Sequence, residues 1–294
     1  MCRGSCVPSA ESLAAVERAA LAGAAEGTRL AVVFEPTGPA WLPIAVFFAR
    51  RGHLVYRVSS AKAADLRRFL RRHAKSNGID AETLARMPLA NPGGLQELEL
   101  PSPDAAALDR PVRACNRLTR AASEHKVRIK DLARQLMPMT PLTGDLGKAD
   151  LAVLEAYADP RALLAASIAE LARLISAASN KQQGHERVGQ WRTAAAAAIE
   201  LYGDHPAVPF AELAAEVITE VRLLRAIQAE LALHAAAREQ HYRRVDPGQL
   251  ARSLPGFAEI SAPVLVAIMG RPGRFRRRHP VQVLRWPRPA GQRD

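Results

Sequence analysis

Aromatic and cysteine residues are scarce in this chain of 294 residues. Phe, Trp and Tyr together make up 5% of it, and the three cysteines are Cys2, Cys6 and Cys115. An odd number of cysteines without a framework spacing excludes a disulfide scaffold and favours a reducing compartment. Cys2 and Cys6 have no second Cys or His pair at ligand spacing nearby, so we interpret them as ordinary thiols rather than a zinc site.

Long apolar runs are also missing. Glu11, Glu17 and Glu26 interrupt the first thirty residues, which therefore contain no secretory signal. The longest uncharged run, residues 36–49, is too short to span a bilayer and carries three prolines. The sequence thus predicts a cytoplasmic protein with no membrane segment.

Several familiar catalytic signatures are absent. The chain has no phosphate-binding glycine loop ending in Lys-Ser/Thr, no dinucleotide fingerprint and no G-x-S-x-G elbow. His234 and His241 lie seven apart on one predicted helix. That spacing is more typical of a solvated helix face than of a metal-ligand pair.

Acidic residues are outnumbered by basic ones. There are 29 Asp and Glu against 41 Lys and Arg, giving a formal net charge of +12 and a pI near 10.4. So strong an excess predicts a polyanionic partner, most often nucleic acid and sometimes an anionic membrane surface. The alternative is a basic soluble protein without such a partner.

The N-terminal part alternates helix and strand. The patterns predict helices over residues 9–25 and 40–51 and strands over 28–34 and 53–58. Ser9 and Ser12 are available as N-caps of the first helix. This alternation favours an α/β unit with parallel strands. A basic helix over 60–75, a turn at 76–78 and a short helix over 79–87 follow.

Beyond Asn91–Gly94 the strand signal disappears and helices dominate. We expect helices over 103–137, 147–157, 160–180, 186–202, 208–243 and 260–269. Apolar positions of the first of these include Val112, Val127 and Ile129, and Pro138 ends it. The helix over 208–243 is long enough for an antiparallel coiled-coil arm.

Two positions are candidates for metal chemistry. Glu35 directly follows a predicted buried strand, and ligands gather at the carboxyl ends of parallel strands. Asn77 and Asp80 are three residues apart, so they share one side of a starting helix. The alternative for Glu35 and Asp80 is stabilisation of a helix first turn.

The helix over 60–75 is a candidate nucleic-acid surface. Its cations are Lys62, Arg67, Arg68, Arg71, Arg72 and Lys75, against the single acid Asp65. Like charges at i,i+4 cost helix stability unless a polyanion neutralises them. The alternative is a solvated basic face.

Three blocks carry a resemblance to one family. Val33–Gly38, Lys75–Ala81 and Leu254–Phe275 resemble, in order and spacing, the insertion-sequence 110 family of transposases, which is related to the Piv DNA invertase. The resemblance implies an incomplete RuvC-like (RNase H-like) α/β domain, a mainly α-helical coiled-coil region, and the helix-hairpin-helix-like start of a transposase C-terminal domain. These are expected over residues 1–90, 91–245 and 246–275.

The resemblance also implies function and site residues. Family members recombine DNA with a D-E-D-D carboxylate set that holds Mg²⁺, and they are guided by a structured RNA. Glu35 matches the family's Glu and Asp80 its last Asp, whereas Asn77 stands where the third carboxylate is expected. In the family the first Asp lies on an opening strand upstream of a helix like residues 9–25, and we expect this strand and its Asp to be missing here. An Asn oxygen brings no charge, so we expect a weak or lost Mg²⁺ site and impaired strand cleavage.

The alternative function is that of a catalytically dead remnant that binds nucleic acid. A homo-oligomer through the helical region is the other expected partner.

The C-terminal blocks add two expectations. Leu254–Phe257, with Gly256, resembles a helix-hairpin-helix turn whose backbone N–H groups contact DNA phosphates; the alternative is an ordinary αα-corner. Residues 276–294 are rich in Arg and Pro without any period, which predicts a disordered basic tail. A shift of one nucleotide permits a string containing G-L-A-P that is similar to the family's sequence after Arg-Phe. We therefore expect this tail to be out of frame and the family's serine nucleophile to be lost.

Overall fold

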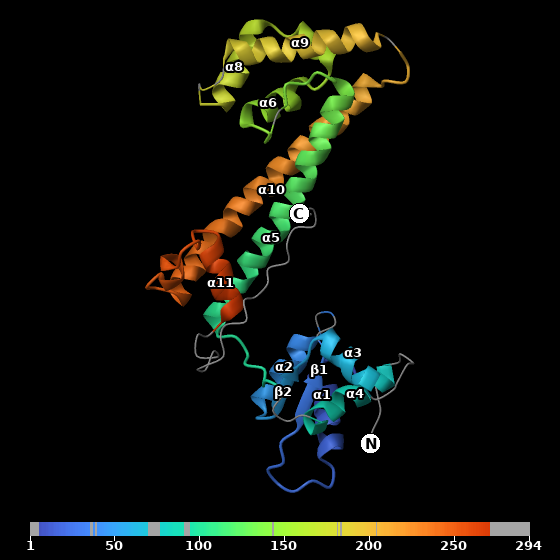
Figure 1. Ribbon diagram of the computed structural model, residues 1–294, viewed down its shortest axis with the longest axis vertical. Coiled ribbons are helices and arrows are strands. Elements are labelled where there is room, and N and C mark those ends of the chain that lie inside the picture. The colour runs from blue at the N-terminus through green and yellow to red at the C-terminus, as the bar shows by residue number, and fades with distance from the viewer. Residues whose placement is uncertain are drawn as a thin grey trace. The chain divides into compact units, whose positions relative to one another are not determined.

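The computed structural model describes residues 6–35, 38, 40–69, 77–90, 95–142, 144–180, 182, 184–203 and 205–270, with the backbone alone at 67, 69 and 77–80. The chain divides into two compact units, Met1–Pro101 and Ser102–Asp294 (Figure 1). The predicted domain division at residue 90, the predicted transposase C-terminal domain and the out-of-frame tail remain predictions, and residues 271–294 lie outside the described part.

The first unit is built on a parallel β-α-β crossover. Strands β1 (Ala31–Phe34) and β2 (Leu54–Arg57) pair in parallel, from Ala31 opposite Leu54 to Phe34 opposite Arg57. Helix α2 (Trp41–Arg50) connects them, and α1 (Ala10–Leu21) precedes β1. The predicted helix–strand–helix–strand order with parallel strands is confirmed.

Local sequence explains where α1 begins and how it is held. The Ser9 hydroxyl accepts a hydrogen bond of 3.2 Å from the amide of Ser12, which confirms Ser9 as the N-cap. Leu13 packs in a small core with Ala45, Phe48 and Val55. This core joins α1 and α2 to one face of the sheet.

A buried acid ties α1 to the amino ends of both strands. Glu17 accepts hydrogen bonds from Arg51 (2.9 Å) and His53 Nε2 (2.7 Å). His53 Nδ1 accepts one of 3.2 Å from the backbone amide of Leu30, which leaves Nε2 as the donor to Glu17. The hydrogen bonds from Arg51 and His53 lower the pKa of Glu17. The network therefore holds a charged carboxylate at the edge of the core.

A short segment after α4 adds to the sheet. Glu97 forms an isolated antiparallel bridge with Tyr56, and the Leu98 amide donates to the Val55 carbonyl at 2.7 Å. Leu98 and Leu100 pack against the core. The prediction that strand structure ends at residues 91–94 is wrong at this point, because a single bridge is too short to show a hydropathy period.

Helices α3 (Ser60–Phe69) and α4 (Asn77–Ala90) complete the first unit. Helix α4 packs against β1 and α3, and it buries Thr83 and Met87. The predicted turn at 76–78 is wrong for Asn77 and Gly78, which are both helical. Residues 70–76 lie outside the described part.

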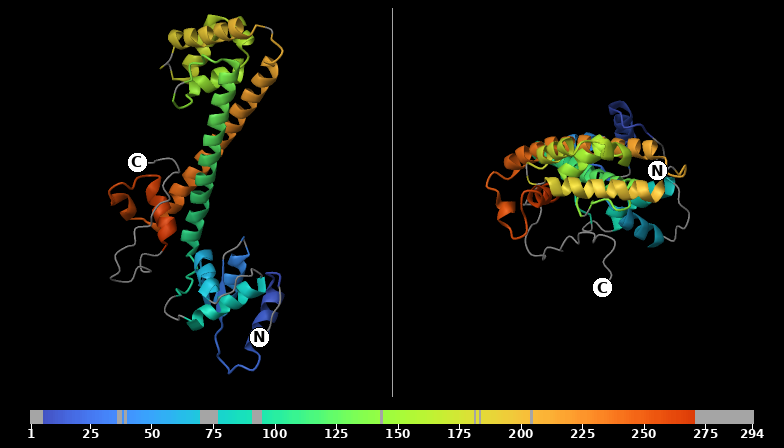
Figure 2. Two further views of the ribbon diagram at one scale, coloured as in Figure 1. Left: turned by 45° about the vertical axis from the view of Figure 1, so that its right-hand side comes forward. Right: turned by 90° about the horizontal axis from the view of Figure 1, so that it is seen from above.

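Two long helices form the arm of the second unit. Helices α5 (Pro103–Leu136) and α10 (Phe210–Val245) lie side by side and antiparallel (Figures 1 and 2). Ser102 caps α5 by accepting a hydrogen bond from the Ala105 amide, and Pro103 occupies the first turn. Both predicted long helices are confirmed within a few residues. Val127, predicted as apolar-face, is 58% exposed.

Four shorter helices cap one end of this arm. They are α6 (Lys148–Tyr157), α7 (Pro160–Ala165), α8 (Ile168–Ala178) and α9 (His185–Tyr202). The predicted single helix over 160–180 is wrong, because Ser167 and Glu170 form a capping box that starts α8 anew. Trp191, Leu154, Leu171 and Ile175 are fully buried at the centre of these helices.

The other end of the arm packs against a short C-terminal segment. This segment contains a 3₁₀ helix, η2 (Leu250–Ser253), and α11 (Ser261–Met269). Leu108 and Val112 from α5 share a core with Tyr242 from α10 and Ala262 from α11. The predicted final apolar helix is confirmed. Among the described residues, no helix is long and apolar enough to cross a membrane.

Candidate functional site

Glu35 lies at the carboxyl end of β1, as the sequence predicts. It directly follows Phe34, whose ring stacks on Trp41 with centroids 6.3 Å apart. The Arg57 guanidinium, at the same end of β2, lies 5.6 Å from the Trp41 ring centroid. Glu35 is half-buried and makes no hydrogen bond or ion pair with any residue that the structure describes.

Asn77 and Asp80 lie in the first turn of α4. Since α4 packs against β1, the element that carries Glu35 and the element that carries Asp80 are neighbours. The side chains of Asn77 and Asp80 are outside the described part. The structure thus brings the two elements together without placing the side chains.

The described part of the chain places one side chain of the predicted metal site. Within the described ranges, no group of three or more His, Cys, Asp or Glu side chains is arranged to hold a metal ion. Glu35 is the one predicted metal ligand whose side chain the structure places. We therefore derive no catalytic step through a metal ion from this geometry.

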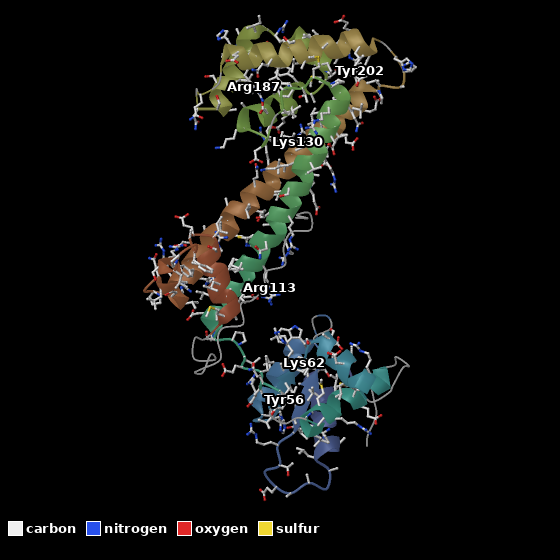
Figure 3. The ribbon with its side chains drawn as sticks, in the orientation of Figure 1. Tyr56, Lys62, Arg113, Lys130, Arg187 and Tyr202 are labelled. Atoms are coloured by element: carbon white, nitrogen blue, oxygen red, sulfur yellow. The ribbon has the colours of Figure 1, made fainter. Side chains whose placement is uncertain are left out.

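The basic helix is only partly placed. The Ser59 hydroxyl accepts a hydrogen bond of 3.4 Å from the Lys62 amide at the start of α3. Lys62 is exposed (Figure 3), and so is Arg68, which pairs with Asp65 one turn away. Arg67 is helical, whereas Arg71, Arg72 and Lys75 lie outside the described part. The Asp65 carboxylate neutralises part of this predicted surface.

Gly256 occupies a tight turn. The Phe257 amide donates to the Leu254 carbonyl at 3.1 Å, and Gly256 has φ +82°, which favours glycine after Pro255. The element before the turn is the four-residue 3₁₀ helix η2 rather than a full α-helix. The turn therefore differs from the predicted pair of apolar helices around a hairpin. A helix-hairpin-helix contact with DNA remains a prediction.

One basic feature of the arm is not predicted by the sequence patterns. Arg110, Arg113 and Arg117 of α5 line a groove of about 470 Å³ together with His234 and His241 of α10. The i,i+3,i+7 spacing of the three arginines was the available signal, since it places them on one helix face. Their convergence with two histidines depends on how α5 and α10 pack.

A known family model matches part of this chain. Residues 7–138 match the family model of the DEDD transposases of insertion sequence 110, described as a transposase. Over these residues, the chain is similar to the insertion-sequence 110 family of transposases. No curated protein matches the chain.

The matched stretch places the candidate residues. It begins before α1 and ends just after α5, so it includes Glu35, Asn77, Asp80 and all the cations of the basic helix. Gly256 lies outside it. The family match supports a role in transposition, and transposases bind DNA.

Proposed function

We propose that this protein is a DNA-binding transposase in which metal-assisted strand cleavage is impaired. The observation that carries the proposal is the family match over residues 7–138. Within this stretch Glu35 follows β1 as a half-buried carboxylate that pairs with none of the described residues. Structured guide RNA as a second partner and self-association through the helical region are finer parts of the same proposal.

The metal ligands in this proposal are Glu35 and Asp80. Their elements, β1 and α4, pack against each other, which supports a shared site at the carboxyl edge of the sheet. When bound, Mg²⁺ supplies positive charge to reacting phosphoryl oxygens. Asn77 offers a neutral amide where the family has a carboxylate. Because Mg²⁺ prefers anionic oxygen ligands, the substitution weakens binding and impairs cleavage.

The nucleic-acid surface in this proposal is the basic helix. Lys62 and Arg68 are exposed on α3, and the sequence continues this row of cations to Lys75. Bound phosphates relieve the repulsion between Arg67 and Arg71 and between Arg68 and Arg72. The contact is with the backbone, so it favours no particular base sequence.

A paired assay tests this function. The full chain is titrated into labelled duplex DNA over a salt series, and the same complexes are then incubated with and without Mg²⁺. We expect binding that falls steeply with salt and little strand cleavage in either condition. Salt-independent or absent binding would contradict the proposal, and so would efficient Mg²⁺-dependent cleavage.

The same assay separates the alternative function. A catalytically dead nucleic-acid-binding remnant binds DNA but cuts none at any Mg²⁺ concentration. The observation that favours this alternative is the neutral side chain of Asn77. Weak cleavage that is abolished by Glu35→Gln would favour the transposase.

A further inference from the structure

A groove runs between the two helices of the arm, in the half nearer to α11. It has a volume of about 470 Å³ and is lined by side chains of α5 and α10. Arg110, Arg113 and Arg117 come from α5, and His234 and His241 come from α10. Figure 3 shows Arg113 on this half of α5. Alanines such as Ala114 and Ala237 leave the space between the two rows.

Helical spacing explains how the two rows form. Residues at i, i+3 and i+7 lie on one helix face, so the three arginines project as one row. His234 and His241 are two turns apart and form a second row on α10. Because α5 and α10 are antiparallel neighbours, the rows face each other across the groove.

Two of the three arginines that line the groove lack an acidic partner among the described residues. Arg113 pairs with Asp109 at 2.6 Å. Arg110 and Arg117 are exposed and make no ion pair or hydrogen bond with any described residue. His241 Nδ1 is buried and has no hydrogen-bond partner within the described part of the chain. An anion in the groove would satisfy these groups.

The rest of the arm has a different charge pattern. Up to residue 230, α10 carries Glu212, Glu216, Glu220 and Glu230. Two cations near those acids are paired: Arg225 with Glu155 at 2.9 Å and Arg128 with Glu220 at 3.8 Å. These acids offset part of the positive charge in that stretch of the arm, whereas Arg110 and Arg117 in the groove have no acidic partner among the described residues.

We propose that this groove is a second nucleic-acid site, which binds the phosphodiester backbone of one strand. Forked guanidinium groups match phosphate oxygens, and imidazole N–H groups add donors. The site lies in the second unit, away from Glu35 and the basic helix in sequence, and it requires no cleavage activity.

Matched double variants test the groove. Arg110→Gln/Arg117→Gln removes two groove charges. Arg128→Gln/Arg134→Gln removes two exposed charges from the same helix outside it. Binding of the full-length chain to a fluorescent 30-nucleotide single strand, a duplex of the same length and an RNA hairpin is measured by anisotropy from 50 to 300 mM salt. Circular dichroism melting checks that both variants fold.

The salt dependence decides the outcome. Each lost contact lowers the slope of log affinity against log salt by about 0.7 for a single strand and about 0.9 for a duplex. We expect the groove variant to lose about 1.4 from the single-strand slope and the control variant less than half of that. Equal losses in both variants, or no loss with any of the three probes, would overturn the proposal.

Crosslinking separates this site from the basic helix. Single strands with 5-iodouracil or 4-thiouracil bases are irradiated with the full-length chain, and crosslinked peptides are identified by mass spectrometry. We expect crosslinks within residues 103–121 and 231–245. They should persist when Arg67, Arg68, Arg71 and Arg72 are all changed to Gln. Crosslinks confined to residues 1–101 would overturn the proposal for the groove and leave the proposed function standing. In a competition experiment, an acidic peptide that binds the groove more tightly than nucleic acid would overturn the assignment of the ligand.

Discussion

The Tyr242 hydroxyl donates a hydrogen bond of 2.8 Å to Asp246 Oδ2 across the last turn of α10. Asp246 also accepts hydrogen bonds from the amides of Leu250 and Ala251, both at 2.9 Å. Arg252 lies over the Tyr242 ring with its guanidinium carbon 4.8 Å from the centroid. These contacts hold η2 against the end of α10, and thereby position the C-terminal segment on the arm.

Removing the acceptor should loosen this junction more than removing the donor. Tyr242→Phe deletes one hydrogen bond, and we expect a loss of about 1 kcal/mol in the free energy of unfolding. Asp246→Ala leaves a buried hydroxyl and two amides without their acceptor, so we expect about 2–3 kcal/mol. Urea unfolding followed by circular dichroism measures both. Equal effects of the two variants would contradict the assignment of Asp246 as the shared acceptor.

The ionisation of the Tyr242 hydroxyl gives a second test, at high pH. Burial and then the hydrogen bond to Asp246 raise its pKa to about 12. A raised pKa stabilises the fold below the ordinary value of 10.0 and the effect is lost as the pH rises through about 12. In an ultraviolet titration of tyrosinate, one group should ionise near pH 12, and Tyr242→Phe should remove that step. A wild-type curve complete by pH 11 would contradict the burial of Tyr242.

The contribution of Glu17 to the stability of the first unit should depend on pH. Hydrogen bonds from Arg51 and His53 lower its pKa below the ordinary value of 4.5. The stabilisation is therefore complete above about pH 4.5 and is lost as the pH falls through the lowered pKa. We expect Glu17→Gln to melt at a lower temperature than the wild type at pH 7 and at nearly the same temperature at pH 3. A melting difference that does not change with pH would show that the charge of Glu17 does not matter.

The elements that were predictable are those with strong local signals. Ser9 starts α1, and Ser102 with Pro103 starts α5, because side-chain caps and a first-turn proline act within one turn of helix. The short strands β1 and β2 were predictable from apolar runs bounded by Gly and Pro. Glu35 could be placed at the end of β1 for the same reason.

The features that were missed depend on contacts between distant residues. The bridge from Glu97 to Tyr56 is one residue pair long and leaves no pattern. The capping box of Ser167 and Glu170 is local, but it lies in an Ala-rich stretch that masks the break between α7 and α8. The groove exists because particular faces of α5 and α10 meet, which periodicity along one helix does not specify.

Asp150 predicts how the cap of the arm is stabilised. Its carboxylate is buried and accepts hydrogen bonds from Arg187 Nη2 at 2.7 Å and Trp191 Nε1 at 3.2 Å. Asp150→Ala leaves a largely buried guanidinium without its partner, and we expect a loss of about 3 kcal/mol in the free energy of unfolding. Asp150→Leu/Arg187→Met should lose less than Asp150→Ala. The single variants Asp150→Leu and Arg187→Met complete the comparison. If the double variant lost the sum of their two losses, Asp150 and Arg187 would not be coupled.

Asn77 predicts how the proposed metal site responds to charge. Asn77→Asp adds a carboxylate three residues from Asp80. We expect Mg²⁺ affinity to rise by roughly an order of magnitude, because a third anionic ligand adds attraction at short range. Isothermal titration calorimetry measures the change, and Glu35→Gln in the Asn77→Asp background should reverse it. If Glu35→Gln left the gained affinity intact, Glu35 would not be a ligand of this site.

Asp65 predicts how the basic helix binds phosphates. Its carboxylate pairs with Arg68 on the exposed face of α3, so it competes with a phosphate for that guanidinium. Asp65→Asn frees Arg68, and we expect tighter duplex binding with a salt slope steeper by up to about 0.9. Asp131→Asn is the matched control, since Asp131 also pairs with an arginine three residues away but lies on α5. Anisotropy over a salt series compares the two variants. If both variants tighten binding to the same degree, the effect is one of net charge alone and the assignment of Arg68 to the phosphate surface is wrong.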